Sequence, residues 1–162
     1  MNNKEDKMKK LLLVAFSFCL VLLSGCTRAG NYKEGTYFSS VEYESYGVKY
    51  VVTANVYVDE NGIIKSCFID STYNKDGVNT TKKVLGDAYG MKSASAQNGV
   101  IEGGAEWYEQ VGVIENKIVK EQGLDWVKWS DEGKTKLDSV SGVTITADVY
   151  IEAVKKALDM AK

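Results

Sequence analysis

The chain has 162 residues, of which 44% are hydrophobic and 26% charged, so it holds enough apolar material for one globular domain with a buried core. A formal net charge of −2 argues against a nucleic-acid partner, which would favour a basic face. The chain has no histidine, which excludes Ser-His-Asp and Cys-His catalysis and histidine metal ligands, and Arg28 is its only arginine.

The first 25 residues are predicted to be a secretory signal. The lysine-rich stretch MNNKEDKMKK precedes LLLVAFSFCLVLLSG, an apolar run too short for a comfortable membrane span. The run ends in LSGC, which resembles the lipobox of bacterial lipoproteins, where the cysteine is acylated and becomes the mature N-terminus. The resemblance implies a lipid such as palmitate on Cys26, a polar tether over residues 26–35, and a single domain over residues 36–162 on the extracytoplasmic face of the bacterial cell membrane. An ordinary signal peptide with a chance cysteine and an uncleaved anchor are the alternatives.

The front of the domain is predicted to be a small antiparallel meander. Residues 35–45 and 48–73 are strand-like, and residues 51–58 alternate in the period of a β-strand with β-branched and aromatic side chains. Asn61-Gly62 is a strong hairpin signal, so residues 49–58 should pair with residues 63–73. Cys67 is the only cysteine of this domain, so no intramolecular disulfide is expected, and its apolar neighbours predict a packed core thiol.

The back of the domain is predicted to be helical. A short helix near residues 80–85 should lead into a polar, glycine-rich loop that runs to Gly104. The next helix should end with Gly123 as its C-cap, and the last helix should begin near Thr146 as its N-cap. Each helix carries an apolar stripe. The stripes are Trp107, Val111, Ile114 and Ile118, and Val149, Ala153, Val154, Ala157, Leu158 and Ala161. The predicted fold class is α+β, with helices packed on one side of a small antiparallel sheet.

The stretch DSVSGVTIT, residues 138–146, is the densest chemical signal in the chain. Asp138, Ser141 and Thr144 supply oxygens, and Gly142 removes a side chain so that a ligand or backbone can come close. Because a helix is expected to begin at its end, unpaired amides there would offer an anion site over residues 141–146. On these grounds alone, a plain hydroxyl-rich loop with a threonine cap is the alternative.

Residues 138–144, DSVSGVT, resemble the flavinylation motif of the FMN-binding domain family. That motif is Asp, two variable residues, Ser or Thr, Gly, usually Ala, then Thr, and Val143 stands where Ala is usual. The family includes flavinylated subunits of sodium-pumping NADH:quinone reductases and Rnf complexes, and bacterial surface lipoproteins linked to extracellular electron transfer. NYKEGTY, TTKKVLGDAYGMKSAS and AEWYEQVGVIENKIV also resemble the family, so the resemblance covers most of residues 31–162.

The resemblance implies FMN joined to Thr144 through a phosphoester, with Asp138, Ser141, Gly142 and Val143 at the other motif positions. A flavin transferase that uses FAD would make this bond after export, and magnesium is expected only for that transferase. The implied function is an electron carrier between a membrane donor and an extracytoplasmic acceptor, more than a stand-alone catalyst.

The flavin ring would need flat or polarizable neighbours. Tyr89 and Met91 lie in the glycine-flanked stretch DAYGMK and are the expected ones. Trp107 and Tyr108 are further candidates, although Trp107 fits the core stripe equally well. Lys92 could bond a flavin carbonyl or simply be solvated.

Two other functions remain open. One is a non-redox binding lipoprotein, either an adhesin or a solute-binding module on the same fold. The other is a reductase with its own small substrate, against which the missing histidine and the lack of a paired acid and base count. In addition, Asp125, Trp126 and Trp129 form an aromatic connector that could dock a redox partner.

Overall fold

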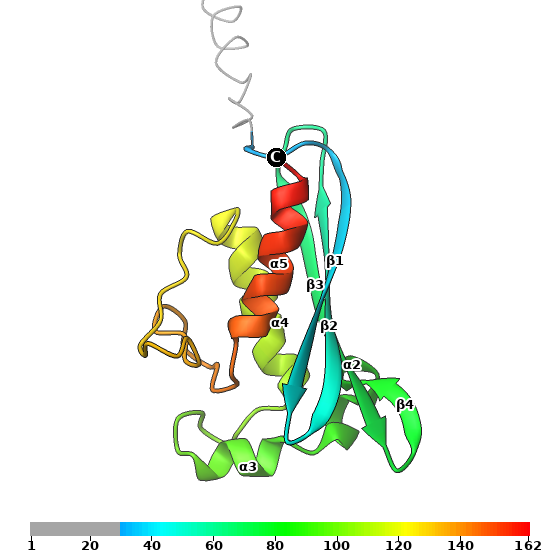
Figure 1. Cartoon of the computed structure of the whole chain (residues 1–162). Helices are drawn as coiled ribbons and strands as arrows, with labels where there is room; N and C mark the ends of the chain where they lie inside the picture. Colours follow the sequence, from blue (N-terminus) through cyan, green and yellow to red (C-terminus); the bar gives the residue numbers. More distant parts are fainter. Residues whose placement is uncertain (1–29) are drawn as a thin grey trace, which may run out of the picture.

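The computed structural model describes residues 30–162. The predicted signal peptide, Cys26 and the start of the tether lie outside the described residues. The domain has one antiparallel sheet in the order β1-β2-β3-β4, with its helices after the strands in the chain (Figure 1). The strands are β1 (Gly35–Ser45), β2 (Val48–Val58), β3 (Ile64–Lys75) and β4 (Val78–Thr81). The predicted α+β class with an antiparallel sheet is confirmed.

The alternation seen in the sequence decides which face of the sheet is buried. In β2, Val52, Ala54, Val56 and Val58 are fully buried, while the residues between them are exposed or partly exposed. A strand places successive side chains on opposite faces, so these four point into the core and their neighbours point to solvent. β2 pairs with β3 as predicted, with a register shift at Tyr57/Val58.

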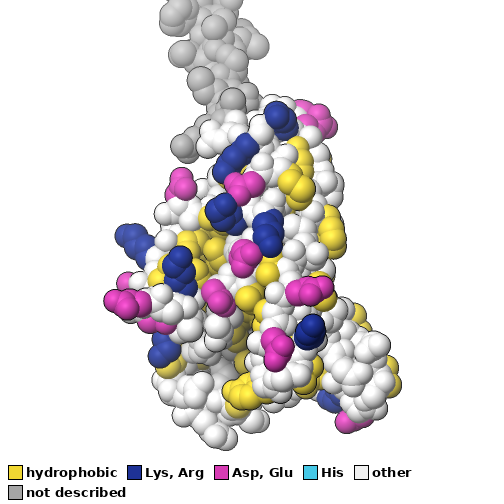
Figure 2. All heavy atoms as spheres, viewed as in Figure 1, with side chains coloured by type: hydrophobic (Ala, Val, Ile, Leu, Met, Phe, Trp, Pro, Cys, Tyr) yellow, Lys and Arg dark blue, Asp and Glu magenta, His cyan; other side chains and the backbone are white. Residues whose placement is uncertain are grey.

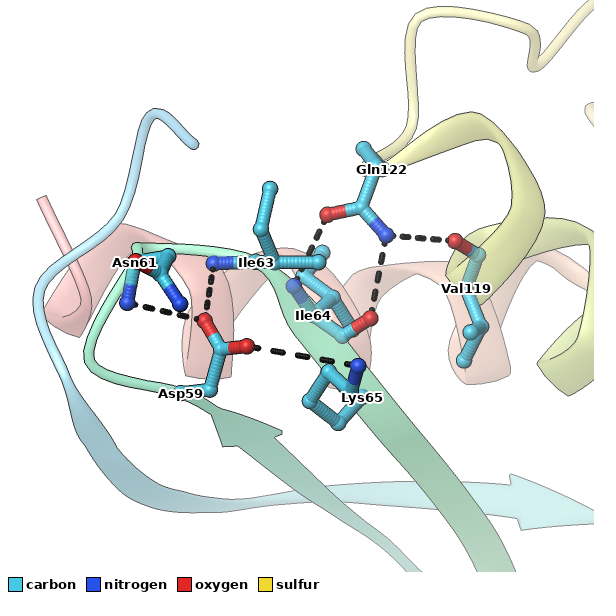
Figure 3. A network of polar contacts seen from close by, with 7 residues as sticks. All are labelled: Asp59, Asn61, Ile63, Ile64, Lys65, Val119 and Gln122. Carbon is cyan, nitrogen blue, oxygen red and sulfur yellow. Dashed lines mark hydrogen bonds and ion pairs between the residues drawn. The ribbon is translucent and has the colours of Figure 1, made fainter. Parts of the chain in front are cut away.

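The turn between β2 and β3 is held by one carboxylate. Asp59 accepts hydrogen bonds from the amides of Asn61 and Ile63, both at 3.0 Å (Figure 3). Gly62 has a φ of +74°, and a Cβ on it would lie 2.6 Å from the carbonyl oxygen of Tyr32. Glycine is therefore required here twice, for the left-handed backbone and for the close approach, and the predicted hairpin is confirmed.

Two long helices cover one face of the sheet. The helical segments are α2 (Lys82–Leu85), the 3₁₀ turn η1 (Gly86–Tyr89), α3 (Lys92–Gln97), α4 (Trp107–Glu121) and α5 (Asp148–Met160). α5 contacts β1 and β2, and α4 contacts β3, so the two lie side by side on the sheet (Figure 1). The predicted stripe of α4 is fully buried, and the stripe of α5 is widened by Tyr150 and Ile151.

Several helix boundaries differ from the prediction. The expected loop up to Gly104 contains η1 and α3. The left-handed residue that ends α4 is Gln122 (φ 59°) rather than Gly123. Its side-chain amide compensates for that conformation, since it donates to the carbonyls of Ile64 and Val119 and accepts from the amide of Ile64 (Figure 3).

The start of the last helix was also predicted wrongly. α5 begins at Asp148, and its N-cap is Ala147, which has no side-chain cap bond. Thr146 is exposed instead of capping the helix. Ala147 is fully buried and its carbonyl accepts from the amide of Ile151, so core packing sets this boundary rather than capping chemistry.

Strand β4 is an addition to the predicted sheet. It pairs with the last four residues of β3 around the turn Asp76-Gly77, where both residues have positive φ. An Asp-Gly pair is a known signal for this type of hairpin turn. β4 leads directly into α2.

The two ends of the described chain meet at one end of the sheet. The amide of Lys33 donates to the carbonyl of Ala161 at 2.7 Å, and the amide of Gly30 donates to the carbonyl of Asn61 at 2.7 Å. Lysine and acidic side chains are interspersed over the visible face (Figure 2). On α5, Lys155 pairs with Asp159 and Lys156 with Glu152. Over residues 30–162, no helix is both long enough and apolar enough to cross a membrane.

Candidate functional site

A cavity of about 520 Å³ lies where β1 ends and α5 begins. This is the end of the sheet opposite to the one where Lys33 meets Ala161 (Figure 1). Among its lining residues are Tyr43, Lys82, Tyr89, Met91, Trp107 and Thr144. Three residues predicted from the sequence, Tyr89, Met91 and Thr144, therefore lie around one cavity although they are up to 55 positions apart in the sequence (144 − 89).

The loop that carries Thr144 is held by a buried glutamine. Gln110 on α4 is fully buried, and its Oε1 accepts from the amide of Thr144 at 2.8 Å, the hydroxyl of Thr144 at 3.1 Å and the amide of Ile145 at 3.2 Å. Its Nε2 donates to the carbonyl of Ala105 at 3.2 Å. One side chain thus joins α4, the segment before it and the motif loop. Gln110 was missed in the sequence, although it stands three residues after Trp107 on the buried face of the helix.

This arrangement corrects the expected anion site over residues 141–146. The amides of Thr144 and Ile145 already donate to Gln110. The helix begins four residues after Thr144, and Asp148 places a carboxylate in its first turn. Helix amides therefore do not form an anion seat at Thr144 as predicted, because the helix starts too late.

The remaining motif residues lie on the other side of Thr144. Ser141, Gly142 and Val143 line a second hollow of about 570 Å³ together with Thr144. Gly142 has a φ of +82°, but a Cβ on it would meet nothing within 4 Å. Its left-handed backbone favours glycine, and no protein backbone comes close to it. Asp138 is exposed and lines neither hollow.

Lys82 occupies the most unusual environment at the cavity wall. Only 7% of the residue is exposed, and its Nζ lies 3.5 Å from the hydroxyl of Tyr43. The Nζ also lies 5.7, 5.3 and 5.2 Å from the ring centres of Tyr50, Tyr89 and Trp107, distances at which a cation is attracted to the face of an aromatic ring. We call the side chains of Tyr43, Tyr50, Tyr89 and Trp107 the aromatic box. Nothing in the pair Lys82-Lys83 indicated which lysine would be buried.

Burial shifts the ionisation of the groups in this box. Desolvation lowers the pKa of Lys82 to about 8, against a smaller opposing effect of Asp70. Desolvation also raises the pKa of Tyr89 to about 12 and raises that of Tyr150, whose hydroxyl accepts from the indole of Trp107 at 3.1 Å. The phenols of Tyr89 and Tyr150 therefore stay neutral at the pH values at which Lys82 is charged.

The segment of Met91 is fixed by a buried carboxylate. Glu106, 4% exposed, accepts from the amide of Met91 at 2.8 Å and from the amide of Lys92 at 3.0 Å. Glu106 also forms a capping box with Glu109 at the start of α4. The spacing Glu106-x-x-Glu109 could have signalled this start. The side chain of Lys92 is exposed and does not line the cavity.

The aromatic connector supports the motif rather than standing free. Trp126 and Trp129 are partly buried and pack against the core, and the indole of Trp126 donates to the carbonyl of Gly123 at 2.8 Å. Trp129 forms a bridge with Leu137, and the amide of Asp138 donates to the carbonyl of Lys128 at 2.9 Å. The connector thus fixes the start of the motif loop.

Comparison with known proteins relates this chain to a protein of known structure. No protein-family model and no curated protein matches it. A solution NMR structure of a protein from Clostridium thermocellum matches with 30% sequence identity and a TM-score of 0.51, over 79% of this chain and 91% of the other. The chain belongs to the same family as this clostridial protein. The two share a fold, and the chemistry of the cavity has to be argued from its own residues.

Proposed function

We propose that this protein is a membrane-anchored, extracytoplasmic electron carrier whose FMN is joined to Thr144 through a phosphoester. The observation that carries the proposal is the position of Thr144. Thr144 lines a cavity that Tyr89 and Met91 also line. The attachment residue implied by the motif and the expected ring neighbours thus face the same space.

The residues of the cavity fit a flavin. Its volume of about 520 Å³ lies within the usual range of small-molecule sites, roughly 300–1,000 Å³. Tyr89 supplies flat apolar surface, and Met91 supplies a polarizable side chain that adapts to a ring edge, while the buried Trp107 backs the cavity from the core. Bound flavin would exchange one or two electrons. A flavin ring that has gained two electrons and one proton carries one negative charge.

The hydrogen bonds of Thr144 are compatible with esterification. An ester removes the proton that the hydroxyl donates to Gln110. The amides of Thr144 and Ile145 would still donate to the same Oε1, so the glutamine would keep two of its three donors. Gln110 would therefore hold the loop in place with or without the cofactor.

The placement of the ends supports a carrier that faces away from its anchor. β1 begins at Gly35, near the first described residue, and ends at Ser45, which lines the cavity. Its 11 residues span about 35 Å at the rise of an extended strand. A lipid on Cys26 would then leave the cavity open toward an extracytoplasmic acceptor.

Mass spectrometry tests the proposal. The full chain is co-expressed in an exported form with a flavin transferase that is supplied with magnesium and FAD. A known substrate of that transferase, treated in the same way, is the positive control. We expect FMN less one water on the Thr144 peptide. Thr144→Val should abolish this adduct. Thr146→Val should keep it and is the matched control, because Thr146 lines the same cavity but lies outside the motif. An unmodified Thr144 peptide beside a fully modified control refutes the covalent flavin.

The competing function, a non-redox binding lipoprotein, makes a different prediction. Protein purified from its native host would be colourless, and dithionite would cause no reversible absorbance change. The electron carrier requires a yellow protein that dithionite bleaches and air restores.

A further inference from the structure

We propose that Lys82 sets the reduction potential of this site, because its buried ammonium lies at the wall of the cavity that would hold the flavin ring and would favour the reduced, negatively charged form. This inference rests on the proposed function. It adds a residue outside the motif and assigns it a separate effect, on potential rather than on attachment.

The geometry places a cation at the cavity wall without a close carboxylate. Among residues 30–162, Lys82 has no ion pair within 4.0 Å, whereas the neighbouring Lys83 lies 2.5 Å from Glu115. The charge of Lys82 is offset only by the aromatic box and by the more distant Asp70. The cavity thus offers a positive charge that a ligand of opposite charge could complement.

A purely structural role explains this lysine poorly. Burying an ammonium without a carboxylate partner is unfavourable, and an apolar side chain of similar length would fill the same space without that penalty. The depressed pKa of Lys82 is the sign of the penalty. An anionic ligand would remove it by supplying the missing partner.

Other charged groups around the cavity do not replace Lys82. The titratable groups that line the cavity or act on Lys82 come from all the elements packed around it. They are Tyr43 and Glu44 on β1, Tyr50 on β2, Asp70 on β3, Tyr89 on η1, and Asp148 and Tyr150 on α5. All are acids or phenols, so Lys82 is the cation of this set. A ring that gains negative charge meets favourable electrostatics at Lys82 and repulsion at Glu44 and Asp148.

The test compares the midpoint potentials of flavinylated variants. Lys82→Met keeps the length of the side chain and removes its charge, and Lys82→Arg keeps the charge. Lys92→Met is the matched control, because Lys92 lies near the cavity with an exposed side chain that does not line it. The intact mass of each variant first shows that FMN is attached, and anaerobic titration with dithionite then gives the potential.

We expect Lys82→Met to favour the oxidised flavin about tenfold or more over the wild type, a potential lower by about 30 mV for a two-electron couple. Lys82→Arg and Lys92→Met should keep the wild-type potential. An unchanged potential in flavinylated Lys82→Met overturns the inference, and so does an equal shift in Lys92→Met. Wild-type protein without FMN overturns the proposed function and this inference together.

A second measurement covers the case in which Lys82→Met does not fold or take up FMN. The pKa of Lys82 is followed in the wild type by NMR of ¹³C-labelled lysine, first in unmodified protein and then with FMN oxidised and reduced. We expect reduction of the flavin to raise the pKa of Lys82. A pKa that does not change on reduction overturns the inference without the use of any variant.

Discussion

Replacement of Gln110 by methionine tests how the motif loop is held. Methionine matches the shape of glutamine, so the cavity and packing costs are small. The change removes the Oε1 that accepts hydrogen bonds from the amides of Thr144 at 2.8 Å and Ile145 at 3.2 Å. It also removes the Nε2 that donates to the carbonyl of Ala105.

The size of the effect follows from the burial of these groups. A buried amide left without an acceptor costs about 1–3 kcal/mol. Ile145 is only 7% exposed and should carry most of that cost, since Thr144 is partly exposed. We therefore expect Gln110→Met to lower the free energy of unfolding by about 2–4 kcal/mol, a large part of the roughly 5–15 kcal/mol of an ordinary domain.

Urea unfolding of the unmodified protein measures the loss, and amide hydrogen exchange locates it. The amides of Thr144 and Ile145 should exchange much faster in Gln110→Met, while those of β2 should change only with global stability. Gln97→Met is the control, because Gln97 is exposed on α3 and its replacement should change stability by less than about 0.5 kcal/mol. Equal stability of the two variants, with unchanged exchange at Thr144, refutes the role of Gln110.

Three further predictions concern single residues. Because the pKa of Lys82 is lowered to about 8 from 10.5, its burial destabilises the fold most below pH 8 and less as the pH rises toward 10.5. Between pH 7 and pH 10, the free energy of unfolding of the wild type should therefore rise by up to about 3 kcal/mol relative to that of Lys82→Met. Parallel plots of unfolding free energy against pH for the two proteins would contradict the burial of a charged lysine. Gly142→Ala should lower the free energy of unfolding by about 1–2 kcal/mol because of the φ of +82° at this position. Gly112→Ala should raise it by about 0.5–1 kcal/mol, because Gly112 lies in α4 with open space at its Cβ. A change of the same sign in both variants would refute this explanation. Burial raises the pKa of Cys67 to about 12, so iodoacetamide at pH 8 should alkylate it at least about 100-fold more slowly in native than in urea-unfolded protein, and equal rates would show an accessible thiol.

Local patterns in the sequence determined the elements of this protein and the sides on which they bury. Period-2 alternation in residues 48–58 and the Asn61-Gly62 turn predicted the central hairpin, because strand facing and hairpin turns depend on near neighbours in the chain. The stripe from Trp107 to Ile118 predicted α4 for the same reason. The motif at residues 138–144 indicated Thr144 as the residue to consider.

Only the tertiary structure decided what surrounds Thr144. Gln110 reaches the motif loop across 34 positions, a contact that no local pattern encodes. The capping preference of Thr146 was overridden because Ala147 packs in the core. Lys82 and Lys83 are identical in type and adjacent in sequence, yet one lines the cavity inside the aromatic box and the other pairs with Glu115. Which of two equal neighbours is buried depends on where β1, β2, η1 and α4 converge, and that is a property of the packed chain.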